Sequence, residues 1–184
     1  MKKTWIIILA VVVVLGFLIF GFYNKMVTAN EAVDGQWAQV ETQYQRRFDL
    51  IPNLVESVKG VMAQEQAVFG AIAEARTRYT GATTVSEKAA AAGEVETALG
   101  RLLAVIENYP ELKSAENVQT LMVQLEGTEN RISVERKRFN DLARDFNVLI
   151  KKVPNRFFAG MFGFNEKAYF EAEETADVAP SVNF

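Results

Sequence analysis

The most regular feature of the chain is an uninterrupted apolar stretch close to its N-terminus. Residues 5–23 contain no charged side chain and are almost wholly apolar. As a helix, about 19 residues rise ~28 Å, which matches the ~30 Å hydrocarbon core of a bilayer. The pattern therefore predicts a transmembrane anchor over residues 1–25.

A secretory signal peptide is the competing interpretation. Lys2 and Lys3 form a basic start, and Val27-Thr28-Ala29 resembles a cleavage site. The anchor is favoured, because the apolar stretch exceeds the ~7–15 residues of a signal core and helical periodicity continues through that site. By the positive-inside rule, the N-terminal charges outweigh Lys25, so the remaining chain should lie outside the cytoplasm. We expect a single-pass protein of the inner (plasma) membrane.

Apolar residues then recur every three or four positions, which is typical of one face of a helix. The first stripe is Val33, Trp37, Val40, Tyr44, Phe48 and Ile51. Because Pro52 lacks a backbone N–H and disfavours a helical residue before it, we expect a break there, with Pro52 in the first turn of a second helix. The second stripe is Leu54, Val58, Val61, Glu65, Val68, Ile72, Ala75 and Tyr79.

Residues 80–83 read as a turn, and Thr84 followed by Glu87 predicts a capping box that begins a third helix. The stripe of this helix is Ala92, Val95, Leu99, Leu102 and Ile106. Residues 108–110 end it. Ser114 is a suitable N-cap for a fourth helix.

The fourth helix, predicted over residues 114–153, is the longest and keeps a seven-residue repeat. One line of the seam is Val118, Leu125, Ile132, Phe139, Phe146 and Val153, and the other is Leu121, Thr128, Glu135, Leu142 and Leu149. Such a seam belongs either to a self-associating coiled coil or to an intramolecular bundle. We expect an all-α fold: a transmembrane helix, an up-and-down four-helix bundle over residues 26–170 with a long fourth helix that Pro154 stops, and a short C-terminal aromatic segment.

The aromatic segment follows the fourth helix, which should return to the membrane if helices alternate in direction. Its cations and rings are Lys151, Lys152, Arg156, Phe157, Phe158, Phe162 and Phe164. These side chains suit a membrane interface, with rings in the acyl boundary and cations towards phosphates. They suit equally a plug for the open end of the bundle.

Residues 171–184 form a tail that begins with acidic residues, and its composition predicts disorder. Val182 and Phe184 at the free carboxylate are candidates for a short peptide ligand that adds to the sheet edge of a partner. A frayed end is the simpler alternative.

Composition excludes several chemistries. The chain has no cysteine and no histidine, so thiolate sites, imidazole zinc sites and the usual general base are absent. We expect no metal and no other cofactor. Three lysines but none of the 23 acids lie in residues 1–25, so the remaining chain is acidic, and nucleic acid is not an expected partner.

Polar residues on or beside the seams predict a buried polar layer. Glu65 and Arg136 would pair in it, because burying either charge alone is costly. Glu129 lies near them in the sequence pattern. A carboxylate pair acting as acid and base is the catalytic alternative, with Glu65 and Glu129 as its members.

Several segments together resemble the LemA family. They are Arg46-Arg47-Phe48-Asp49-Leu50-Ile51-Pro52-Asn53-Leu54-Val55, Tyr109-Pro110-Glu111-Leu112-Lys113, Glu126-Gly127-Thr128-Glu129-Asn130-Arg131-Ile132, Arg138-Phe139-Asn140-Asp141, Asp145-Phe146-Asn147 and Phe158-Ala159-Gly160-Met161-Phe162-Gly163-Phe164. The resemblance implies a bacterial single-pass membrane protein with a four-helix bundle and no established enzymatic activity.

Members of that family are often drawn with the bundle in the cytoplasm, which conflicts with the charge bias of this chain. The resemblance adds Asn53, Asn140 and Asn147 to the polar layer of Glu65, Glu129 and Arg136. Phe139 and Phe146 stand where tyrosine is common in the family motifs.

The sequence therefore predicts a membrane-anchored, non-enzymatic scaffold or adaptor. Its partners would be copies of itself or other membrane and envelope proteins. The alternative is a module that engages membrane lipid through residues 157–164 to sense or shape the bilayer.

Overall fold

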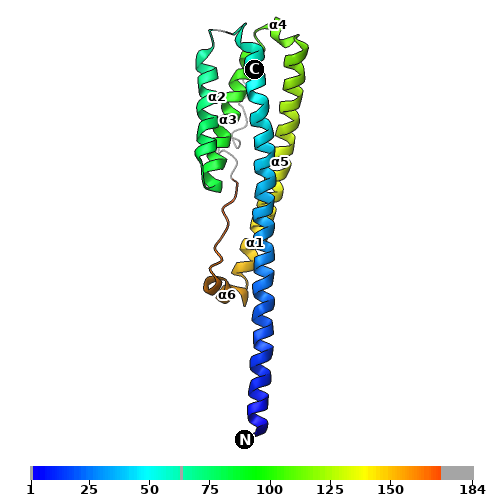
Figure 1. Ribbon diagram of the computed structural model, residues 1–184, viewed down its shortest axis with the longest axis vertical. Helices are drawn as coiled ribbons and strands as arrows, with labels where there is room; N and C mark the ends of the chain where they lie inside the picture. The colour runs from blue at the N-terminus through cyan, green and yellow to red at the C-terminus, as the bar shows by residue number, and fades with distance from the viewer. Residues whose placement is uncertain (1, 63, 171–184) are drawn as a thin grey trace, which may run out of the picture. The chain divides into compact units, whose positions relative to one another are not determined.

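The computed structural model describes residues 2–62 and 64–170. These residues form six helices and no strand, which confirms the predicted all-α fold (Figure 1). The helices are α1 Lys2–Lys59, α2 Gln66–Gly81, α3 Val85–Ile106, α4 Pro110–Lys113, α5 Glu116–Lys151 and α6 Asn155–Phe162. The chain divides into two compact units. Among the described residues, unit 1 contains 2–39 and 137–168, and unit 2 contains 40–62, 64–136 and 169–170.

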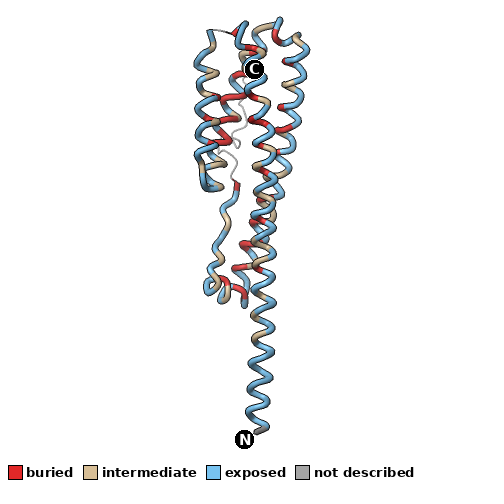
Figure 2. The backbone as a smooth tube through the Cα atoms, in the orientation of Figure 1, coloured by how far each residue is buried: buried red, intermediate tan, exposed pale blue. Residues whose placement is uncertain are grey.

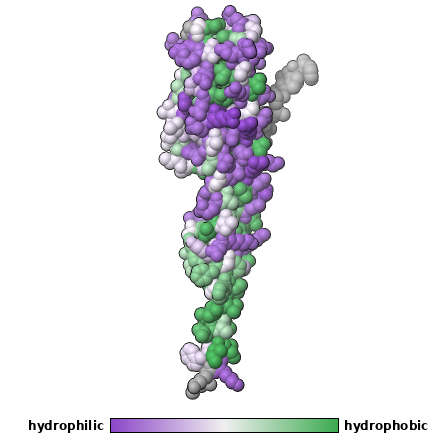
Figure 3. Space-filling view, turned by 45° about the vertical axis from the view of Figure 1, so that its right-hand side comes forward, coloured by the Kyte–Doolittle hydropathy of each residue, from purple (hydrophilic) through white to green (hydrophobic). Residues whose placement is uncertain are grey.

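Unit 1 contains an apolar helix surface that is exposed among the described residues. α1 is the one helix among the described residues that is long and apolar enough to cross a membrane. Its large apolar side chains from Trp5 to Phe20, apart from the half-buried Ile19, are about half to three-quarters exposed, as the pale blue trace and the green surface show (Figures 2 and 3). An apolar surface of this size is unfavourable in water and suits a lipid environment. The chain is therefore membrane-associated.

The rest of unit 1 packs α1 against the C-terminal part of α5 and against α6. Trp37 of α1 meets Phe139 of α5 edge to face, with ring centroids 5.2 Å apart. The buried residues of this unit are Met26, Val33, Phe139, Ala143, Phe146, Asn147, Ile150, Asn155 and Ala159. α6 ends at Phe162 and is capped by Gly163, whose φ of 78° is left-handed, a conformation that favours glycine.

Unit 2 is the helical bundle. The last part of α1, then α2, α3 and the first part of α5 run alongside one another in alternating directions, with α4 in the connection before α5 (Figure 1). Its apolar core includes Tyr44, Phe48, Leu54, Ile72, Tyr79, Val95, Leu99, Leu102, Ile106, Val118, Leu125 and Ile132. The predicted up-and-down arrangement of four helices is thus present. The capping box of Thr84 and Glu87 is also present at the start of α3.

The predicted helix break at Pro52 is wrong. α1 continues through Pro52 and ends only at Lys59. Pro52 is exposed, whereas its neighbours Ile51 and Leu54 are buried. Burial of these apolar residues outweighs the hydrogen bond that proline cannot donate, so packing overrides the local preference.

The predicted limits of the fourth helix also need correction. α5 begins at Glu116, and Ser114 lies at the end of α4, where its hydroxyl donates to the Glu111 carbonyl. At the other end the helix stops at Lys151, ahead of Pro154, and Val153 is 74% exposed. The remaining residues of its first line, from Val118 to Phe146, are buried. Because they face the chain's own helices, the seam belongs to an intramolecular bundle.

Candidate functional site

A cluster of two arginines and two glutamates joins three helices of unit 2. Arg47 of α1 forms an ion pair with Glu129 of α5, and its Nη1 lies 3.8 Å from Glu96 Oε1 of α3. Arg136 of α5 donates from Nη2 to the same Glu96 oxygen at 2.7 Å. Arg47 is 7% exposed. The cluster therefore connects α1, α3 and α5 through one shared, half-buried carboxylate.

Aromatic side chains enclose this cluster. The Tyr44 hydroxyl donates to Glu96 Oε1 at 3.3 Å. The Arg136 guanidinium lies 4.2 Å from the Phe170 ring centroid and 5.5 Å from that of Tyr44, which is within cation–π range. Each charge thus has an opposite charge or an aromatic face beside it.

Burial controls the ionisation of the cluster. It raises the pKa of Glu96 above the ordinary glutamate value, while the charge of Arg136 opposes that shift and the charge of Glu129 adds to it. Burial likewise raises the pKa of Tyr44. The Glu96 carboxylate lies beside two guanidinium groups and a hydroxyl, so its oxygens interact with groups of the protein itself. This arrangement is typical of a structural ion network.

The structure brings together only part of the predicted polar layer. Glu129 and Arg136 belong to the cluster, but the predicted Glu65–Arg136 pair is wrong, since Arg136 binds Glu96. Glu65 immediately precedes α2 at its N-cap position. The reason is the displaced helix break: because α1 continues through Pro52 to Lys59, Glu65 precedes α2 instead of lying within a helix. Asn53 is exposed on α1.

The other two predicted asparagines belong to unit 1. Asn147 is 3% exposed and holds the backbone of Lys167: its Nδ2 donates to the Lys167 carbonyl at 2.9 Å, and the Lys167 N–H donates to its Oδ1 at 2.8 Å. Asn140 is half-buried. Asn147 therefore fastens the segment after α6 to α5.

Sequence reasoning missed Arg47 and Glu96 as the centre of the cluster. A signal was available for Arg47, because it stands three residues after Tyr44 and four before Ile51, and so lies on the apolar stripe of α1. Glu96 lies directly beside the buried Val95. Both positions show charge at the edge of an apolar stripe, which is the pattern of a buried ion pair.

Unit 2 also contains a groove of about 620 Å³ between α3 and α5 that reaches Arg47 of α1. Its apolar lining is Leu99, Leu103, Met122, Val123 and Leu125, and its polar lining is Arg47, Lys113, Gln119, Glu126 and Glu129. Val123 is 67% exposed. An apolar floor with a charged rim is the surface that an amphipathic helix of a partner fits.

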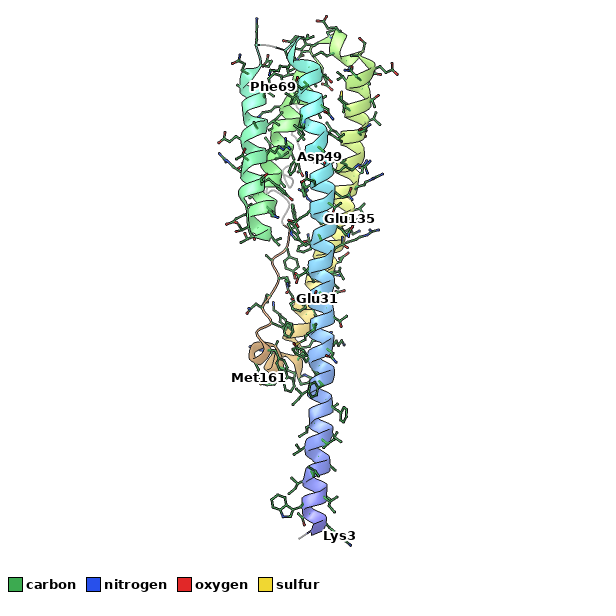
Figure 4. All side chains as sticks on the ribbon, in the orientation of Figure 1. Lys3, Glu31, Asp49, Phe69, Glu135 and Met161 are labelled. Carbon is green, nitrogen blue, oxygen red and sulfur yellow. The ribbon has the colours of Figure 1, made fainter. Side chains whose placement is uncertain are left out.

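The predicted aromatic segment of unit 1 is divided between two environments. Phe158 and Phe162 of α6 pack on Phe22 and Tyr23 of α1, with ring centroids 5.7 and 5.0 Å apart. Phe164 contacts Tyr23 at 6.1 Å. The large apolar side chains of α6 that are exposed are instead Phe157, at 72%, and Met161, which Figure 4 labels, at 65%.

The predicted cations Lys151, Lys152 and Arg156 lie just before α6 or in its first turn. Lys151 forms an ion pair with Glu166 at 2.7 Å, and Lys152 lines a pocket together with Lys25 of α1. Arg156 is exposed at the start of α6. Val182 and Phe184, the candidate peptide ligand, lie outside the described residues.

No group of three or more carboxylates is placed to hold a metal ion within residues 2–62 and 64–170.

The chain is similar to magnetosome proteins of two species and to one family model. Magnetosome protein MamQ 2 of Paramagnetospirillum magneticum is 28% identical over 181 aligned positions, and magnetosome protein MamQ of Magnetospirillum gryphiswaldense is 29% identical over 181. In both cases the match covers 84% of this chain and 66% of the relative, so the chain spans just under two thirds of the relatives' length.

The model of the LemA family matches residues 36–184, a range that includes the ion cluster, the groove and α6. Most of the chain, with its helical bundle and its C-terminal aromatic helix, therefore follows the family pattern, and the chain is a member of the LemA family.

Proposed function

We propose that this protein is a membrane-anchored, non-enzymatic scaffold of the LemA type, which associates with copies of itself or with other envelope proteins. Two features of the same chain support the proposal. Unit 1 contains an exposed apolar helix, and unit 2 is a folded bundle with an open apolar groove. The first feature supports attachment to a bilayer. The second supports docking of a partner.

The ion cluster supports a structural role for the bundle core. Glu96 interacts with Arg47, Arg136 and Tyr44 at the same time, so its ionisation depends on how three helices pack. The groove borders this network, since Arg47 and Glu129 line it, and it adds exposed apolar surface such as Val123, which is 67% exposed. A scaffold needs this combination of a rigid body and a free apolar surface.

The groove is tested by Val123→Lys. We expect the substitution to raise the concentration at which the detergent-solubilised, full-length protein self-associates by at least about tenfold, since it places a charge in an apolar contact worth more than ~1.4 kcal/mol. Light scattering measures the mass, and crosslinking in native membranes with mass spectrometry identifies neighbours.

Val134→Lys is the matched control for this experiment. Val134 is also an exposed apolar residue of α5, at 48%, but it does not line the groove. Its substitution should leave association unchanged. A wild-type protein that is monomeric and forms no crosslink in membranes would contradict the scaffold proposal.

A second candidate function is engagement of lipid by residues 157–164, and the exposure of Phe157 and Met161 favours it. α6 packs through Phe158 and Phe162 on the last turn of the apolar part of α1, so its outward side chains lie at the level where a bilayer interface would be. Rings and cations at that level are typical of an interfacial helix.

The chain's lack of cysteine allows a direct test. Nitroxide labels at Phe157→Cys and Met161→Cys, in full-length protein in bilayers, should collide more with oxygen than with a polar nickel complex, because they enter the acyl boundary. A label at Thr97→Cys, on the exposed surface of α3, should show the opposite preference. Equal nickel accessibility at all three positions would reject lipid engagement by α6.

A further inference from the structure

A pocket in unit 1 has the composition of a lipid-binding site. It has a volume of about 530 Å³ and lies between α1, the end of α5 and the residues that lead into α6. Its apolar lining includes Phe22, Leu142, Phe146, Leu149 and Pro154. The charged lining consists of Lys25, Lys152 and Asp145.

The height of the pocket along α1 follows from the sequence of that helix. Phe22 belongs to the last turn of the apolar stretch, and Lys25 is the first charged residue after it. With a rise of about 1.5 Å per residue, Lys25 lies roughly 4–5 Å beyond Phe22 along the helix axis. If α1 spans a bilayer, the apolar lining faces the acyl boundary and Lys25 faces the phosphates.

The two lysines have their ammonium groups available for a ligand. Both are exposed, and among residues 2–62 and 64–170 neither forms an ion pair with a carboxylate. Their neighbours differ: Lys151 is paired with Glu166, and Lys167 with Asp34. Two cations against the single carboxylate of Asp145 favour an anionic ligand.

Asn155 gives the pocket a second, independent polar feature. This side chain is only 7% exposed and lines the pocket. Its Nδ2 donates to the Leu149 carbonyl at 3.0 Å, which fixes the orientation of the amide. Its Oδ1 is buried and accepts no hydrogen bond from the described part of the chain. A buried acceptor without a donor is unfavourable, so the site suits a ligand that carries an N–H or O–H group.

We propose that this pocket binds the headgroup of an anionic phospholipid that carries hydroxyl groups, as phosphatidylglycerol does. Lys25 and Lys152 bind the phosphate, a glycerol hydroxyl donates to Asn155 Oδ1, and the start of an acyl chain lies on the apolar lining. A choline headgroup has no donor and no net charge, and an ethanolamine headgroup has a donor but no net charge. The inference rests on the membrane attachment proposed above.

The first experiment compares lipids that bind to the full-length protein in nanodiscs of defined composition, by native mass spectrometry of the retained lipid. Wild type should retain phosphatidylglycerol over phosphatidylcholine of the same acyl chains. Lys25→Gln and Lys152→Gln should each lower that preference by roughly fivefold, the factor that corresponds to one lysine near an anionic headgroup.

Lys151→Gln is the matched control, since Lys151 is adjacent in sequence but is paired with Glu166 and does not line the pocket. It should leave the preference unchanged. If Lys151→Gln reduces the preference as much as Lys152→Gln, the lysines act by general surface charge and the pocket is overturned.

The second experiment isolates the hydroxyl group. Phosphatidylmethanol has the charge of phosphatidylglycerol but no donor, so wild type should prefer phosphatidylglycerol, and Asn155→Leu should remove that preference while the preference for anionic over choline lipid remains. Circular dichroism checks that α6 is retained. Equal retention of the two anionic lipids by wild type would overturn the role of Asn155.

The experiments distinguish an error in the proposed lipid site from an error in the proposed membrane attachment. Wild-type protein that stays in the bilayer after carbonate washing but binds glycerol and choline lipids equally overturns the pocket alone. Protein that carbonate releases overturns the membrane attachment, and the pocket with it.

Discussion

At the scale of single residues, Glu96 determines how the bundle responds to pH. Its carboxylate is shared by Arg47, Arg136 and the hydroxyl of Tyr44, and Glu129 lies opposite Arg47. Burial nevertheless raises its pKa, so the folded protein holds this proton more tightly than the unfolded chain. Ionisation of Glu96 therefore lowers the stability of the fold, even inside an ion network.

The pH dependence of stability tests this conclusion. As pH rises from the ordinary glutamate pKa of ~4.3 to the raised pKa of Glu96, wild type should lose stability with a slope of at most ~1.4 kcal/mol per pH unit, and the loss stops above the raised pKa. Glu96→Gln imitates the protonated carboxyl and should lack this slope. Urea unfolding across the pH range measures it.

Glu94→Gln is the control at this scale, because Glu94 lies on the same helix in an exposed ion pair with Arg78. It should keep the wild-type slope. Parallel pH profiles for wild type and Glu96→Gln would contradict the assignment of the slope to Glu96.

At the scale of helices, Pro52 shows tertiary packing overriding a local signal. It lies inside α1 and leaves the Phe48 carbonyl without its usual helical donor, while Phe48, Ile51, Leu54 and Val58 hold that part of the helix in the core. The helix therefore persists despite an unfavourable residue.

Pro52→Ala should stabilise the bundle, by up to about 3 kcal/mol, because it restores a backbone donor and removes the ring from the helix. Equilibrium unfolding of the solubilised protein measures the change. Asn53→Ala, at the adjacent exposed position, should change the free energy of unfolding by no more than ~0.5 kcal/mol. A loss of stability in Pro52→Ala would argue that the chain needs a break at that residue.

At the scale of the whole molecule, the open question is which side of the membrane carries the bundle. We propose a single span of the inner (plasma) membrane with the bundle outside the cytoplasm, because Lys2, Lys3 and the amino terminus outweigh Lys25. Thr97→Cys should then react with an impermeant maleimide in intact spheroplasts, and Lys3→Cys only after permeabilisation. The reverse labelling pattern would place the bundle in the cytoplasm.

Much of the fold follows from periodicity. The stripes of α1 and α3, the heptad line of α5 from Val118 to Phe146, and the capping box at Thr84 were all predictable, because helical spacing and N-cap chemistry are local properties. The site was predictable only in part. The sequence analysis named Glu129 and Arg136, which lie in the cluster, but missed Arg47 and Glu96, since a charge beside an apolar stripe does not reveal its partner.

The sequence by itself determined that a long apolar segment near the N-terminus is followed by amphipathic helices, because hydropathy and helical spacing are local properties of the chain. Only the tertiary structure decided where α1 ends, which carboxylate Arg136 binds, and that Phe157 and Met161 rather than Phe158 and Phe162 are exposed on α6. These outcomes depend on competition between distant residues for burial, and that competition is resolved only when the helices pack.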